Sequence, residues 1–255
     1  MKRWVFSEVV KSYSCHDVAV SVMIVLLCQS IAPRPASIVE PLYFYASQAG
    51  KPTLDQGEGG GNPFASALVE LLGRDNLTFE EFRTELVQLT ERKSSRFQRP
   101  EVLARADLGT WQLLPKPSAE RRVALVVVFS DYSAGGALSL PGAKHDLYRI
   151  AVALNKAGFE VQEILDPDLA KLEIALREFA DRSAASDVAL LYTTGHGAEV
   201  EGMIYLFPGD YPVSQGSARL KDRAVRLTTL GSALHASRAN LIFYGGCRNN
   251  PFGPQ

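Results

Sequence analysis

The second half of the chain alternates apolar runs with amphipathic segments, and this order restricts the fold more than any other feature. The apolar runs cover residues 123–129, 159–165, 188–193 and 240–244. Segments with helical periodicity lie between them, at residues 144–157, 169–184 and 227–236. Strands buried on both faces and joined through helices form parallel sheets with right-handed crossovers. The sequence therefore predicts an α/β fold on a mainly parallel sheet, with a small hairpin at residues 199–208 after the third strand.

The sequence predicts fewer helices and strands in the first half of the chain. These are a strand at residues 38–46, a glycine-rich loop at 50–61, helices at 62–73 and 78–93, and a short strand at 108–114. Asn62 is the N-cap of the first helix, with Pro63 in its first turn. Thr78 is the N-cap of the second, and Glu81 stands at the capping-box position. The polar, proline-bearing stretch 116–122 is expected to link the two halves.

Composition limits the partners and the location that we expect. The chain has 255 residues, a formal net charge of −1 and no basic stripe, which disfavours nucleic acid as a partner. Its three cysteines, Cys15, Cys28 and Cys247, are an odd, sparse set without the spacing of a zinc site. A disulfide scaffold is equally disfavoured. We therefore expect a reducing, cytoplasmic compartment and no cofactor.

An apolar run at residues 18–27 resembles the core of a signal peptide. However, the charged residues Glu8, Lys11 and Asp17 lie between the start of the chain and this run. The run is also too short to span a bilayer. We interpret it as a buried strand or helix and expect no association with membranes.

Two predicted strands end in glycine-rich turns that each carry a reactive side chain. The third strand leads into Gly195, His196 and Gly197, and the fourth leads into Gly246 and Cys247. Reactive groups in open parallel sheets gather beyond the carboxyl ends of the strands. An imidazole there can take the proton of a thiol and return it to a leaving amine. The N–H groups of Gly197 and Cys247 are candidates for an oxyanion hole.

Other polar clusters have simpler interpretations. The glycine cluster at residues 57–61 lacks the residues of a phosphate-binding loop, and no such turn follows Phe129, which disfavours a nucleotide-binding module. His145 is expected to be a surface or cap residue. Acidic residues at strand ends are more often turn residues than metal ligands, so we expect no metal site at Asp131, Asp166, Asp168 and Asp210.

Five stretches in the second half resemble the large-subunit region of bacterial caspase-like peptidases, the caspase and metacaspase group (peptidase C14). They are residues 140–146 (LPGAKHD), 157–161 (AGFEV), 192–197 (YTTGHG), 202–210 (GMIYLFPGD) and 247–252 (CRNNPF). The resemblance implies a three-layer α/β/α fold, the catalytic dyad His196 and Cys247, and a peptide or protein substrate. It also implies that Asp146 matches an acid lining the first substrate pocket.

The order of the parts differs from that family. Residues 37–115 resemble the small-subunit region, which in the family follows the nucleophile. Residues 1–36 resemble the end of a preceding caspase-like unit, with a helix at 5–14 and a strand at 22–30. Cys28 stands there at the place of a nucleophile, and we interpret it as structural because no matching histidine precedes it. The chain is therefore expected to be a permuted single domain, a swapped dimer or longer assembly, or a gene fragment.

The predicted site also departs from the family. Gly245 and Gly246 precede the nucleophile where relatives carry Asp-Ala, so a preference for basic substrates depends on Asp146 alone. Arg248 could instead favour an acidic substrate side chain, and Asp55 could contact substrate or form a turn. Two hypotheses follow. One is a cysteine endopeptidase that uses a Cys247 thiolate with His196 as general base and acid. The other is an inactive caspase-like module that acts in assembly or regulation.

Overall fold

The computed structural model of the chain describes residues 39–253 except 58, 104–107 and 109–110. The expected helix at 5–14, the strand at 22–30 and Cys28 lie outside the described residues, as does the whole segment 1–36. Everything reported below belongs to the body formed by residues 38–255.

A six-stranded sheet forms the centre of this body, in the order β2-β1-β9-β5-β3-β4. Its strands are β1 (Leu42–Tyr45), β2 (Glu101–Leu103), β3 (Arg122–Val128), β4 (Glu160–Leu165), β5 (Val188–Thr194) and β9 (Ala239–Tyr244). All neighbouring pairs are parallel except β1 and β2. Every residue of β3, β5 and β9 is buried, as expected of central strands covered on both faces. The predicted mainly parallel α/β sheet is confirmed.

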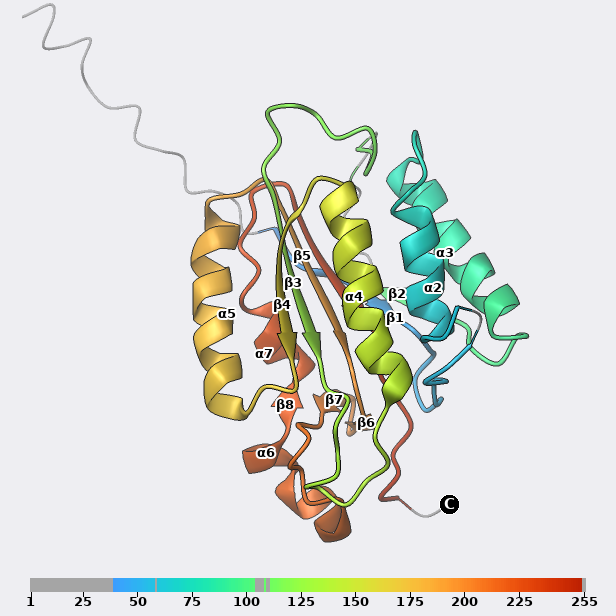
Figure 1. Cartoon of the computed structure of the whole chain (residues 1–255), viewed down its shortest axis with the longest axis vertical. Helices are drawn as coiled ribbons and strands as arrows, with labels where there is room; N and C mark the ends of the chain where they lie inside the picture. The colour runs from blue at the N-terminus through green and yellow to red at the C-terminus, as the bar shows by residue number, and fades with distance from the viewer. Residues whose placement is uncertain (1–38, 58, 104–107, 109–110, 254–255) are drawn as a thin grey trace, which may run out of the picture. The chain divides into compact units, whose positions relative to one another are not determined.

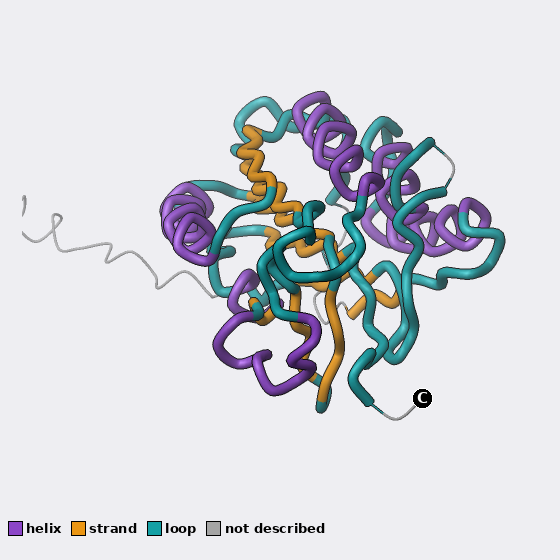
Figure 2. The backbone as a smooth tube through the Cα atoms, turned by 60° about the horizontal axis from the view of Figure 1, so that its bottom comes forward, coloured by secondary structure: helices purple, strands orange, loops and turns teal. Residues whose placement is uncertain are grey.

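Helices cover both faces of the sheet and make three layers (Figure 1). One face packs against α2 (Pro63–Leu71), α3 (Phe79–Lys93) and α4 (Pro141–Lys156). The other packs against α5 (Leu169–Ala184) and α7 (Leu227–Gly231). The tube in Figure 2 shows the same helices on either side of the strands. The cap at Asn62 and the capping box between Thr78 and Glu81 form as predicted.

The predicted hairpin belongs to a small second sheet. It consists of β6 (Gly197–Val200) and β7 (Met203–Leu206), and β8 (Val225–Arg226) pairs with β7. Glu201 and Gly202 form its turn with φ of 53° and 75°, the positive values that suit a tight two-residue hairpin. Two short helices, η1 (Val213–Arg219) and α6 (Leu220–Arg223), connect β7 to β8.

Residues from before the linker join the sheet of the second half. β1 pairs in parallel with β9, so that Phe44 lies opposite Phe243. Their rings stack with centroids 4.4 Å apart, and the ring of Phe82 from α3 meets Phe243 edge-on. One hydrophobic core therefore draws on both halves of the chain.

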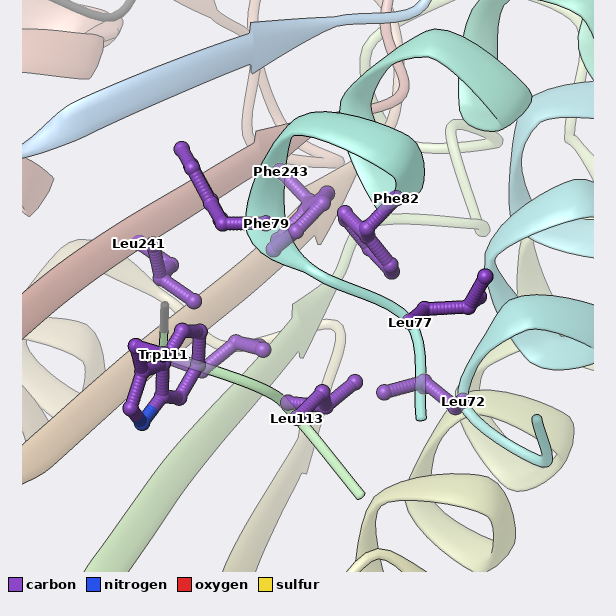
Figure 3. A pocket seen from close by; sticks show the side chains of 9 residues that line it. Leu72, Leu77, Phe79, Phe82, Trp111, Leu113, Leu241 and Phe243 are labelled. Atoms are coloured by element: carbon purple, nitrogen blue, oxygen red, sulfur yellow. The ribbon is translucent and has the colours of Figure 1, made fainter. Parts of the chain in front are cut away.

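Two sequence-based expectations are wrong in detail. Of the expected strand 108–114, the described residues form a loop with a single bridge between Gln112 and Thr78. Its apolar side chains, among them Trp111 and Leu113, line a small apolar cavity beneath α2 and α3 (Figure 3). The edge strand is β2 instead. The helix expected to reach residue 236 ends at Gly231, because the Ser183 side chain of α5 binds the following turn.

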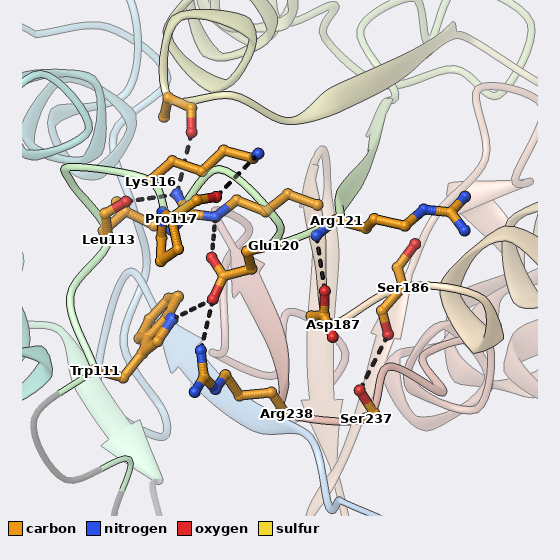
Figure 4. A network of polar contacts seen from close by, with 12 residues as sticks. Trp111, Leu113, Lys116, Pro117, Glu120, Arg121, Ser186, Asp187, Ser237 and Arg238 are labelled. Carbon is orange, nitrogen blue, oxygen red and sulfur yellow. Dashed lines mark hydrogen bonds and ion pairs between the residues drawn. The ribbon is translucent and has the colours of Figure 1, made fainter.

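The linker is only partly solvated. Pro117, Ser118 and Ala119 are exposed, but the next residue, Glu120, is buried. Its carboxylate accepts hydrogen bonds from Trp111 and pairs with Arg122 at 2.6 Å and Arg238 at 2.9 Å (Figure 4). Burial alone would raise the pKa of Glu120, but the hydrogen bond and charge of Arg122, with further hydrogen bonds from Trp111 and Arg238, lower the pKa below its usual value.

Candidate functional site

The loops that carry His196 and Cys247 are adjacent because their strands are adjacent. β5 and β9 pair in parallel up to Thr193 and Tyr244, and the Gly245 N–H then donates to the Thr193 carbonyl at 2.8 Å. Both reactive residues therefore follow the carboxyl ends of neighbouring strands, at one edge of the sheet. This placement is the one that the sequence predicted.

Glycines let the two loops approach each other. A Cβ atom at Gly246 would lie 2.9 Å from the carbonyl oxygen of Gly195 and 2.5 Å from the Tyr244 hydroxyl. A Cβ atom at Gly197 would lie 2.1 Å from the same hydroxyl. The Tyr244 hydroxyl thus lies between the two loops, and it donates to the carbonyl of Cys247 at 3.0 Å. A side chain at either glycine would force the surrounding residues to shift.

The imidazole of His196 is held on two sides. Its Nε2 lies 2.7 Å from the carbonyl oxygen of Leu138, and its ring meets the ring of Tyr132 edge-on at 4.5 Å. A carbonyl only accepts hydrogen bonds, so Nε2 carries the hydrogen and Nδ1 of the neutral ring has the free electron pair. The Tyr132 hydroxyl also accepts the His196 backbone N–H at 2.7 Å. Leu138 and Tyr132 carry no motif that would have marked them in the sequence.

Cys247 is a half-buried free thiol whose neighbour comes from before the linker. The backbone N–H of Thr53 points at its Sγ at 3.3 Å, and the Thr53 hydroxyl lies 3.4 Å from the same sulfur. The Thr53 hydroxyl also donates to the Gly245 carbonyl at 3.2 Å. Sequence reasoning missed Thr53, because nothing in its local sequence indicates a contact with a residue 194 positions away.

The structure leaves the two backbone N–H groups that the sequence proposed for an oxyanion hole free of bonds to the neighbouring strands that it describes. Within the described residues, the N–H of Cys247 has no hydrogen-bond acceptor. Just before β6, the Phe207 N–H donates to the His196 carbonyl at 2.8 Å. Ladder bonds alternate in antiparallel strands, so the N–H of Gly197 points away from β7.

Asp146 lies beneath the glycine-rich loop and is fully buried. Its carboxylate accepts the Asn62 N–H at 2.9 Å and pairs with Arg149 at 3.3 Å. A Cβ atom at Gly61 would lie 1.8 Å from one of its oxygens, so only glycine fits there. Burial raises the pKa of Asp146 to about 7, against the opposing effects of the Asn62 N–H and the Arg149 charge. The Asn62 side chain donates through Nδ2 to the Gly245 carbonyl at 3.2 Å. Asn62 therefore connects Asp146 to the loop that carries Cys247.

Arg248, the residue after the nucleophile, is buried and paired. It forms ion pairs with Glu199 at 2.8 Å and with Glu101, and its guanidinium lies 4.3 Å from the centre of the Tyr45 ring. It also donates to the carbonyl of Ser47. Its charge is therefore balanced within the protein, and it fixes the nucleophile loop to β6 and to the edge of the sheet.

Asp55 lies at the start of α4. Its two carboxylate oxygens accept the N–H groups of Gly142 and Ala143 at 3.0 and 2.9 Å. These amides belong to the first turn of α4, where the N-cap residue Leu140 offers no side-chain hydrogen bond. The structure thus gives Asp55 the role of a cap supplied from a distant part of the chain.

The four carboxylates at strand ends, Asp131, Asp166, Asp168 and Asp210, have partners within the protein. Among residues 39–253 that the structure describes, no group of three or more His, Cys, Asp or Glu side chains is close enough to hold a metal ion. The carboxylates at strand ends accept from Ser133 (Asp131), Ser130 (Asp166) and Lys171 (Asp168), or pair with Arg223 (Asp210). His145 is exposed, as predicted. In the same part of the chain, no helix has the length and apolar character needed to cross a membrane.

Comparison with known proteins agrees with this geometry. A family profile described as the caspase domain matches residues 121–253, which include both reactive residues and the strands that carry them. No curated protein matches the chain. The profile covers more than half of the 255 residues, so the chain belongs to the caspase-domain family of cysteine peptidases.

Proposed function

We propose that this protein is a cysteine endopeptidase in which a Cys247 thiolate attacks the substrate carbonyl and His196 transfers the protons. The observation that carries the proposal is the close packing of the two loops around the Tyr244 hydroxyl, at the ends of neighbouring strands. The proposed enzyme resembles the bacterial metacaspase type and works in the reducing cytoplasm, where Cys247 remains a free thiol.

The proposed reaction uses the free electron pair on Nδ1 of His196. This nitrogen accepts the thiol proton, while the Leu138 carbonyl keeps the ring oriented through Nε2. The thiolate forms a bond to the carbonyl carbon of a peptide, and the resulting oxyanion is stabilised by the N–H groups of Gly197 and Cys247. The imidazolium then protonates the leaving amine, and a water deprotonated by His196 releases the acyl group.

The residues around the dyad shape the proposed peptide site. In this proposal Asp146 borders the first substrate pocket from beneath the glycine-rich loop, and Asp55 and Arg248 hold the pocket walls in place. We also propose that the residue order is a permutation within one chain, which is supported by the packing of β1, β2, α2 and α3 beside the strands that carry His196 and Cys247. Light scattering of the purified protein measures its self-association, which a swapped dimer would require.

The dyad is tested by substituting each member. Cys247→Ala is expected to abolish cleavage of a peptide library and labelling by a thiol-reactive peptide probe, and His196→Ala to reduce both by a factor of about 10² or more. Cys28→Ser is the matched control, with unchanged activity. Undiminished cleavage by Cys247→Ala would show that another group is the nucleophile.

A catalytically inactive module acting in assembly or regulation is the second candidate. It is favoured by the balanced charges near the site, because Asp146 and Arg248 are both buried and ion-paired. A pocket without an unpaired charge offers no strong attraction to a charged substrate side chain. Clean turnover of Arg-, Lys- or Asp-containing peptides by the purified protein would exclude this candidate.

A further inference from the structure

We propose that Thr53 is a positioning residue whose hydroxyl turns from the Gly245 carbonyl to the Cys247 sulfur when the thiol loses its proton. The inference rests on the proposed function, because it concerns the ionisation of the same nucleophile. It extends the site to a residue that lies before the linker and outside the matched caspase domain.

The hydroxyl of Thr53 has two partners but only one hydrogen. Its oxygen lies 3.2 Å from the Gly245 carbonyl oxygen and 3.4 Å from Sγ of Cys247. A carbonyl accepts only, so in the thiol state the hydroxyl donates to Gly245, and its oxygen is the nearer acceptor for the S–H hydrogen, ahead of the Thr53 carbonyl oxygen at 3.9 Å from Sγ. This arrangement satisfies both groups while the sulfur is protonated.

Loss of the thiol proton reverses the second of these bonds. A thiolate only accepts, and hydrogen bonds to a charged acceptor are stronger than those to a neutral one. The hydroxyl therefore turns to the sulfur, where it joins the Thr53 N–H that already points at Sγ from 3.3 Å. Two donors from one residue then stabilise the negative charge.

This rotation of the Thr53 hydroxyl leaves no buried acceptor without a hydrogen-bond partner. The Gly245 carbonyl, which the hydroxyl gives up, keeps the Nδ2 group of Asn62 at 3.2 Å. A buried carbonyl that lost its sole donor would cost free energy comparable to a lost hydrogen bond. Because Asn62 remains, the rotation exchanges a bond to a neutral carbonyl for a bond to a thiolate.

The backbone around Thr53 is held firmly enough for this role. The Arg248 N–H donates to the Lys51 carbonyl at 3.0 Å, and the Gly50 N–H donates to the Arg248 carbonyl at 3.2 Å. On the other side of Thr53, the Leu54 N–H donates to the side chain of Gln98 at 3.0 Å. The segment is thus fixed to the nucleophile loop on one side and to the α3–β2 connection on the other.

The test measures thiolate formation directly, without a substrate. The full-length protein is treated with iodoacetamide between pH 5 and 9, and modification of Cys247 is followed by mass spectrometry of the tryptic peptide of residues 239–248. The comparison includes wild type, Thr53→Val, Thr53→Ala and Thr53→Ser. Val keeps the shape of the side chain, Ala removes it, and Ser retains the hydroxyl.

Both Thr53→Val and Thr53→Ala are expected to alkylate Cys247 about threefold to tenfold more slowly at pH 7, the effect of one hydrogen bond. Their rate profiles should shift to higher pH, and Thr53→Ser should restore the wild-type profile. Agreement between Val and Ala separates the hydroxyl from packing, and thermal melting shows whether each variant is folded.

An unchanged or faster alkylation of the folded Val or Ala variant would overturn the proposal, because the hydroxyl would then merely cover the sulfur. The outcome is independent of peptide hydrolysis. A hydroxyl-dependent alkylation profile in a protein that cleaves no peptide would refute the endopeptidase function and keep the role of Thr53. Peptide cleavage together with an alkylation profile that does not depend on the hydroxyl would keep the endopeptidase function and refute the role of Thr53.

Discussion

Two charged side chains of the site, Arg248 and Asp146, are oriented by other protein groups. Arg248 is ion-paired with Glu199 and Glu101, and Asp146 with Arg149. A buried charge that loses its partner destabilises a protein strongly, so such pairs fix geometry. At this site they fix the loops that present His196 and Cys247.

The raised pKa of Asp146 makes a prediction about stability. The folded carboxyl has a pKa of about 7, above its usual value of 3.8, so the folded state binds more protons than the unfolded state between these two pH values. Its contribution to the free energy of unfolding therefore decreases as pH rises from about 4 to 7, by up to about 4 kcal/mol. Asp146→Asn removes this dependence.

Urea unfolding of wild type and Asp146→Asn at pH 4.5, 5.5 and 7 measures the effect. The variant is expected to gain stability relative to wild type as pH rises, because its amide does not ionise. Asp168→Asn, at an exposed helix cap, is the control for a general pH effect. A constant difference between Asp146→Asn and wild type across this range would contradict the prediction.

At the scale of elements, α4 depends on a cap from outside its own sequence neighbourhood. Four amides at the start of any helix lack partners within the helix, and here Asp55 binds those of Gly142 and Ala143. A negative charge at this end of the helix is also favoured by the helix dipole. The helix carries Asp146, so its placement affects the site.

We expect Asp55→Ala to lower the free energy of unfolding by about 1–2 kcal/mol, because it leaves two amides without acceptors. Asp55→Asn keeps one acceptor oxygen and is expected to lose less. Chemical denaturation measures both. An Asp55→Ala variant as stable as wild type would show that water replaces the carboxylate at no cost.

How well each element was predicted depends on where its determinants lie. The periodicity of residues 169–184 predicted α5 with the bounds that the structure shows, and the Thr78 capping box did the same for the start of α3. These signals are local. The expected strand at 108–114 failed because its apolar residues fill space beneath α2 and α3, which only the tertiary structure defines.

The residues of the candidate site likewise fall into those that the sequence predicts and those that depend on tertiary structure. His196 and Cys247 could be predicted because the ends of parallel strands meet at one edge of a sheet. Thr53 could not, since its contact with the sulfur depends on β1 entering the sheet beside β9. The burial of Arg248 likewise depends on β2 and β6, which bring Glu101 and Glu199 to it.

At the scale of the whole molecule, the two halves of the chain share a core and a site. β1 lies between β2 and β9, and Phe44 stacks on Phe243 across the junction. Thr53 and Asn62 then contact the nucleophile loop from the first half. The covalent link through residues 116–122 raises the effective concentration of each half for the other but supplies none of these contacts.

Cutting the link should therefore leave the halves associated. A specific protease site can be inserted between Ser118 and Ala119, which are exposed, so that the inserted site is accessible and Glu120 itself is unchanged. After cleavage, the two pieces are expected to elute together in size-exclusion chromatography and to separate only in denaturant, since the buried aromatic and strand-pairing contacts persist.

Phe44→Ala removes the ring that stacks on Phe243. It should weaken the association of the two pieces by about 3–5 kcal/mol if the cavity left behind does not collapse. Pieces that separate under native conditions would mean that the link itself holds the halves together, and that the shared core contributes less than its burial indicates.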